Sequence, residues 1–144
     1  METIDRDISS DSDLIIDNRI KLFLAETSKW ANFLSIIGFV MLGLMVIVSF
    51  VMIAMTASIL GAEALGIGVM YLFMVALYFF PTLYLFKFAR KIKAGILSTS
   101  QEDMTQGFEN LKKLFKFMGI LMIVLLGFYA LVLLISLFAG LSNF

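Results

Sequence analysis

The chain contains no cysteine and no histidine, and its 144 residues include a single proline. Without cysteine there is no disulfide and no thiolate nucleophile, and without histidine there is no imidazole base. Most zinc, haem and copper sites also depend on those two residue types. The acids gather mainly in the first 26 residues, spread along a polar segment, which does not favour a carboxylate metal site. We therefore expect a non-enzymatic protein with no cofactor, no metal and no nucleic-acid partner.

Charge is also scarce, since 15% of the residues are charged and 61% are hydrophobic. A soluble domain has about a quarter charged and about half apolar residues, so this composition is typical of a membrane protein. Three runs carry no charge, at 30–62, 64–86 and 117–144, and each exceeds the roughly 20 apolar residues that one crossing needs. The first run is not two crossings, because residues 33–60 contain no Pro, Asn or Asp for a turn. The sequence predicts an all-α membrane protein with three transmembrane helices.

The chain opens with the acidic stretch METIDRDISSDSD, whereas a secretory signal peptide opens with basic residues and soon becomes apolar. We predict a disordered acidic tail over residues 1–12 and a single helical membrane domain over 13–144. The predicted helices cover 13–60, 66–97 and 101–140. Their spans are expected at 33–58, 66–87 and 118–139.

The positive charges are distributed on one side only of the three predicted spans. Four precede the first span and seven lie between the second and third spans, whereas GAEALG at 61–66 and GLSNF at 140–144 have none. Lysine and arginine in short segments remain on the cytoplasmic side. The expected location is the cell inner membrane, with the N-terminus in the cytoplasm and the C-terminus outside.

Each span is predicted to continue as an amphipathic helix on the basic side. Residues with a shared apolar face are Ile16, Ile20, Phe23, Leu24, Trp30 and Ala31, then Leu85, Phe88, Ala89, Ile92 and Ile96, then Met104, Phe108, Leu111, Leu114, Phe115 and Met118. Ser28 falls on the polar side of the first helix. Ser100 is predicted to cap the third helix, and Glu109 and Lys113 have the i,i+4 spacing of an ion pair. Three apolar stripes predict a small bundle, although one helix lying flat on the membrane is the alternative.

The second span ends in a cluster of cations, Lys87, Arg90, Lys91 and Lys93. Such a cluster binds anionic lipid headgroups or serves as a topology anchor, and the anchor is the simpler interpretation. Pro81, inside the same span, removes one backbone hydrogen bond and predicts a helix kink. An ion site at the kink is the alternative, but transporters with such sites show paired interruptions in repeated halves, and this chain has no internal repeat.

Small residues recur in the first predicted helix, where they let another helix approach closely. The candidate packing residues are Gly38, Gly43, Ala54, Ala57, Ser58 and Gly61. They serve packing within the chain or association between chains, and the spacing does not separate the two.

Three segments together resemble one family: W-x-x-F-L-S-I-I-G-F at 30–39, Y-F-F-P-x-L-Y-L-F-K-F-A-R-K-I-K at 78–93 and F-x-x-L-K-K-L-F-K-F-M-G-I at 108–120. The family is a small bacterial one of three-span integral membrane proteins, a domain of unknown function. The resemblance covers residues 14–138 and implies a bacterial inner-membrane location. It implies no catalytic residues.

The function that these patterns favour is a structural or accessory subunit, which associates with itself as a homo-oligomer or with a larger membrane protein complex in the lipid bilayer. An oligomeric small channel or transporter is a second hypothesis. It requires several subunits to build a pathway, and a ring of Tyr78 or an inward-facing Glu63 would favour it. A module that interacts with anionic lipid through the basic cluster is a third.

Overall fold

The computed structural model describes residues 16–142, which form three long helices. They are α2 (Asn18–Leu60), α3 (Glu63–Ser98) and α4 (Gln101–Ser142), and each is long and apolar enough to cross a membrane. The predicted fold class, an all-α membrane protein with three spans and a small bundle, is confirmed. The predicted acidic tail at 1–12 lies outside the described residues.

The first helix begins and ends at residues whose chemistry suits a helix terminus. Asp17 is the N-cap residue, and its side chain accepts a hydrogen bond from the adjacent Asn18 N–H at 2.6 Å, which satisfies one free backbone donor at the start of the helix. At the other end Gly61 has φ +56, which side chains rarely tolerate, and its N–H donates to the Ala57 carbonyl at 3.1 Å. Only Gly61 and Ala62 therefore separate α2 from α3, and Gly61 makes the turn.

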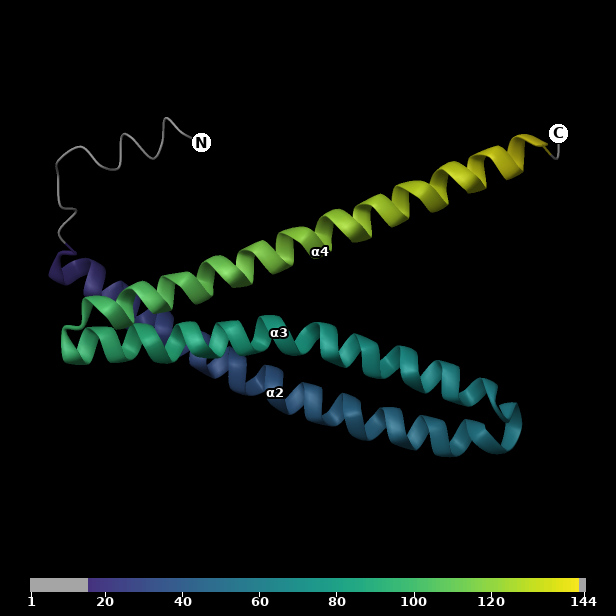
Figure 1. Cartoon of the computed structure of the whole chain (residues 1–144), viewed down its shortest axis with the longest axis horizontal. Coiled ribbons are helices and arrows are strands. Elements are labelled where there is room, and N and C mark those ends of the chain that lie inside the picture. Colours follow the sequence, from purple (N-terminus) through teal and green to yellow (C-terminus); the bar gives the residue numbers. More distant parts are fainter. Residues whose placement is uncertain (1–15, 143–144) are drawn as a thin grey trace.

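Helices α2 and α3 lie side by side in opposite directions as a hairpin (Figure 1). The face that α2 buries is a heptad row, because Ser28, Ser35, Leu42 and Ser49 are its buried residues at intervals of seven. Such a repeat matches the left-handed crossing of two nearly antiparallel helices. The small serines let α3 approach, and each hydroxyl donates to a carbonyl of its own helix. The placement of Ser28 on a polar face was wrong: it is 3% exposed, because its hydrogen bond to the Ala25 carbonyl satisfies the hydroxyl locally.

The three helices converge at the end of the molecule that carries the basic residues (the basic end), and there they enclose a hydrophobic core. Its buried residues are Ala31 of α2, Phe88, Ala89 and Ile92 of α3, and Met104 of α4. Ile16, Leu24, Leu85, Ile96 and Leu111 pack against this cluster, so the predicted face of α3 is wholly in the core. The bundle is therefore confirmed over the alternative of a helix lying flat. Several residues of the predicted apolar faces remain exposed: Ile20, Phe23 and Trp30 of α2, and Phe108, Phe115 and Met118 of α4. At the start of α4, Gly107 rather than Phe108 meets Ile92.

A chain of aromatic contacts marks where the bundle ends and α4 separates from the hairpin. Phe39 of α2 contacts Phe79 and Phe86 of α3, and Phe80 of α3 contacts Phe117 of α4 with ring centroids 6.0 Å apart. Beyond this level α4 diverges from the hairpin, and its far end lies well apart from the α2–α3 turn (Figure 1). No residue of the most apolar stretch of α4 is buried, although α2 and α3 bury part of theirs.

Candidate functional site: the basic cleft between α3 and α4

A cleft of about 600 Å³ lies between α3 and α4 at the basic end. We call it the basic cleft; its lining is Phe86, Lys87, Arg90 and Lys91 from α3 and Gln106, Glu109, Asn110 and Lys113 from α4. Four of these eight side chains are cations and two are amides, against one carboxylate. Because lysine and arginine only donate hydrogen bonds, the cleft presents donors to whatever enters it.

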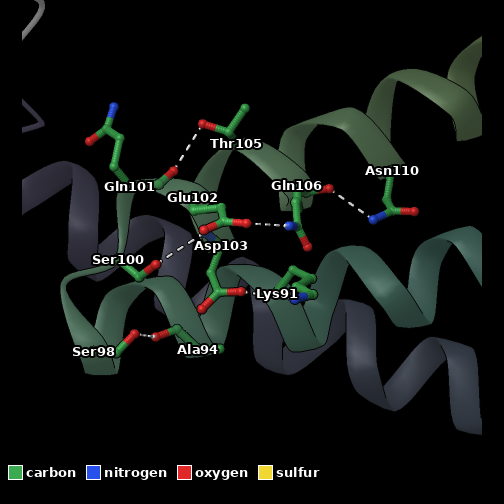
Figure 2. A network of polar contacts seen from close by, with 10 residues as sticks. All are labelled: Lys91, Ala94, Ser98, Ser100, Gln101, Glu102, Asp103, Thr105, Gln106 and Asn110. Carbon is green, nitrogen blue, oxygen red and sulfur yellow. Dashed lines mark hydrogen bonds and ion pairs between the residues drawn. The ribbon is translucent and has the colours of Figure 1, made fainter.

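A two-residue connection holds the walls of this cleft together. Thr99 adopts a left-handed conformation with φ 53, and Ser100 follows it and accepts a hydrogen bond from the Asp103 N–H at 3.3 Å. This confirms the predicted cap. Figure 2 shows Asp103 of α4 directed toward Lys91 of α3, and their ion pair measures 2.9 Å. The pair fixes the first turn of α4 against the last turns of α3.

Polar side chains along α4 are ordered by a further set of contacts, which Figure 2 shows in one row. Gln106 donates from its amide nitrogen to Glu102 at 3.2 Å, and Asn110 donates to the Gln106 carbonyl at 2.8 Å. Each of these amide nitrogens carries a second hydrogen. The amides therefore add directed donors to the α4 wall of the cleft.

The cations of the cleft differ in how far they are already neutralised. Lys113 pairs with Glu109 at 2.8 Å, as the i,i+4 spacing predicts. Their hydrogen bond, followed by the attraction of the opposite charges, lowers the pKa of the Glu109 carboxyl and raises the pKa of Lys113. Neither Lys87 nor Arg90 has an ion-pair partner among residues 16–142, and the guanidinium of Arg90 lies over the Phe86 ring at 5.4 Å. Two uncompensated cations therefore remain.

The structure brings together three of the four predicted cluster residues and adds Phe86 of α3 and four residues of α4 that were missed. Lys87, Arg90 and Lys91 line the cleft, whereas Lys93 is exposed outside it. The missed residues of α4 are Gln106, Glu109, Asn110 and Lys113. Their spacing of three or four places them on one face of a helix. That spacing is visible in the sequence, but its alignment with the α3 cations depends on how the two helices pack.

Pro81 lies within α3, which continues as a helix on both sides of it. Pro81 frees the Leu77 carbonyl from its helical hydrogen bond. The neighbouring Thr82 hydroxyl donates to the next carbonyl, that of Tyr78, at 2.9 Å, and not to the freed one. Pro81 and Tyr78 also line an apolar cavity of about 380 Å³ with Leu34, Leu114 and Phe115, where α4 leaves the hairpin. This cavity suits only an apolar group. The predicted kink stays a prediction.

Five of the six predicted packing residues lie in α2 and divide into two sets, whereas the sixth, Gly61, makes the turn after α2. Gly38 faces α3 so closely that an added Cβ would lie 2.7 Å from the Thr82 methyl carbon. Gly43, Ala54, Ala57 and Ser58 are exposed, and an added Cβ at Gly43 would meet nothing within 4 Å. At 100° per residue these four fall within about 100° of one another, and their mean direction is turned about 100° from that of the heptad row. They form a second face of α2 that α3 does not cover, which we call the small-residue face.

Comparison with protein families, with curated proteins and with solved structures found no match for this chain. Among the described residues, no group of three or more acids could hold a metal ion. Glu63 is exposed at the start of α3, and Tyr78 is 56% exposed. The basic cleft and the small-residue face are therefore the two candidate binding surfaces.

Proposed function

We propose that this protein is a non-enzymatic structural subunit of a membrane assembly, built from copies of itself through the small-residue face of α2. The observation that carries the proposal is that Gly43, Ala54, Ala57 and Ser58 are exposed on one side of a helix apolar enough to span. Such a face contributes little contact area against lipid, yet it lets a second backbone approach closely. A second copy presents the same face, so a two-fold contact is self-complementary.

The separation of α4 from the hairpin supports the same proposal. Figure 1 shows α4 diverging from the α2–α3 hairpin, and no residue of the most apolar stretch of α4 is buried. A neighbouring copy in the same orientation offers helices of matching length that would cover this unburied stretch.

Cysteine cross-linking tests the association, since the chain has no cysteine of its own. Ala57→Cys places a thiol on the small-residue face and is expected to give a covalent dimer as the main product on mild oxidation in membranes. Disulfides form only when two Cβ atoms come within about 4.5 Å, which random collisions rarely sustain. Non-reducing electrophoresis measures the product.

Ile59→Cys is the matched control, because Ile59 lies at nearly the same depth on α2 and is 82% exposed, but on the opposite side of the helix. It is expected to stay monomeric. Equal cross-linking of the two variants would contradict an oriented interface. Monomers from both, with a different protein bound in mild detergent, would assign the face to another membrane protein instead.

We propose further that the protein resides in a bacterial inner membrane with the basic end in the cytoplasm. The charge distribution of the whole chain supports this orientation, because all Lys and Arg precede the first span or lie between the second and third.

Ser142→Cys is expected to react with a membrane-impermeant thiol reagent applied to intact cells, and Ser12→Cys is expected to react only after lysis. The physical reason is that the three spans place the two ends on opposite sides. The reverse labelling pattern would overturn the orientation, and labelling of both from outside would contradict three crossings.

A further inference from the structure

We propose that the basic cleft binds the phosphate of an anionic lipid headgroup, with Lys87 and Arg90 as its principal ligands. The site goes beyond the proposed assembly and does not depend on it. The α4 wall supplies the amide donors of Gln106 and Asn110, so the phosphate is held between two helices rather than on one basic surface.

The depth of the cleft favours a lipid over a solute. Lys87 is the first charged residue after the uncharged run 64–86 of α3, and Lys116 is the last before the uncharged run 117–144. Lys113 precedes Lys116 by three residues, about 4.5 Å of helix rise. The headgroup layer on each side of a bilayer is about 5–7 Å thick. The membrane-proximal part of the cleft therefore lies at the level of lipid phosphates.

The charge balance of the cleft fits an anion. Lys91 and Lys113 are already paired with Asp103 and Glu109, at 2.9 Å and 2.8 Å. The Lys91–Asp103 pair joins the α3 and α4 walls, and the Lys113–Glu109 pair lies within α4. Lys87 and Arg90 are left to neutralise a ligand. Arg90 stacks on Phe86, which orients its guanidinium. An arginine held in this way presents parallel N–H donors that match two phosphate oxygens.

The test uses the full chain in a non-ionic detergent, with phosphatidylglycerol titrated in and bound lipid counted by native mass spectrometry. Lys87→Gln combined with Arg90→Gln is expected to weaken retention of phosphatidylglycerol at least about tenfold, since each basic residue near a lipid surface contributes about a factor of five. The control double variant, Lys93→Gln with Lys112→Gln, removes the same charge from exposed positions outside the cleft and is expected to retain the lipid.

Two further arms separate the sources of phosphate. Inorganic phosphate is expected neither to bind detectably nor to displace phosphatidylglycerol, and zwitterionic phosphatidylcholine is expected to bind weakly in wild type and variants alike. Equal loss in the two double variants would overturn the site in favour of diffuse attraction. Displacement by inorganic phosphate, with the same dependence on Lys87 and Arg90, would reassign the cleft to a soluble anion, and absence of binding in the wild type would end the proposal.

Glu109→Gln tests the site through a gain that misfolding does not produce. Removing this carboxylate frees Lys113, whose Nζ lies 2.8 Å from it, and deletes the one acid of the cleft lining. Retention of phosphatidylglycerol is expected to increase severalfold. Unchanged or weaker binding by a correctly folded Glu109→Gln protein would count against a ligand in the cleft.

Discussion

Ile92→Ala is expected to loosen the bundle at the basic end by about 2–5 kcal/mol, the cost of removing a large aliphatic side chain from a closed core. Ile92 is fully buried, in a core to which all three helices contribute. A Cβ added to Gly107 would lie 2.7 Å from the Ile92 Cδ1 atom, so α4 packs directly against the Ile92 side chain. Hydrogen exchange of the amides at 86–96 and 101–112 measures the effect, as protection at least about tenfold lower.

Leu97→Ala is the matched control, because leucine and isoleucine are isomers and Leu97 lies on the same helix with 76% of its surface exposed. It is expected to leave exchange nearly unchanged, since surface substitutions away from special features usually stay within about 0.5 kcal/mol. The bundle would be refuted as a cooperative core if the two substitutions altered exchange equally.

Gly95→Ala is expected to destabilise the contact between α3 and α4 by about 1–3 kcal/mol. In most helix interiors the same substitution is stabilising. An added Cβ at Gly95 would lie 2.9 Å from the backbone nitrogen of Met104 and 2.8 Å from its Cγ. A side chain can rotate away, but a backbone atom in a helix moves only with the whole helix. The readout is the melting temperature in detergent, monitored by the fluorescence of Trp30, the single tryptophan.

Gly119→Ala serves as the control, since an added Cβ there would meet nothing within 4 Å. It is expected to be neutral or to stabilise α4 by up to about 1 kcal/mol, because alanine loses less backbone entropy than glycine on forming a helix. A higher melting temperature for Gly95→Ala, like that of Gly119→Ala, would show that the two helices do not approach this closely.

Much of the fold is determined by the sequence through the properties of a bilayer. In a bilayer, the backbone N–H and C=O groups of a span must hydrogen-bond to one another, which favours a helix. The three helices are therefore predicted by the uncharged runs at 30–62, 64–86 and 117–144. The apolar face from Leu85 to Ile96 is likewise read from its period, because a helical stripe outside the membrane must be covered. The cations of 87–93 identify the basic end of α3, because charged side chains are costly inside the bilayer.

The tertiary structure decided which residues meet across helices. A serine hydroxyl can be buried when it donates to a carbonyl of its own helix, so a prediction from residue polarity placed Ser28 on the wrong face. Only the packing of α3 showed that Ser35 and Ser49 continue the same buried row. Likewise, the spacing from Gln106 to Lys113 defines a helix face but not its neighbour. The close approach at Gly95 and the Lys91–Asp103 pair set the register that turns this face toward Lys87 and Arg90. Local periodicity determines a face, whereas its partner depends on contacts between residues distant in the chain.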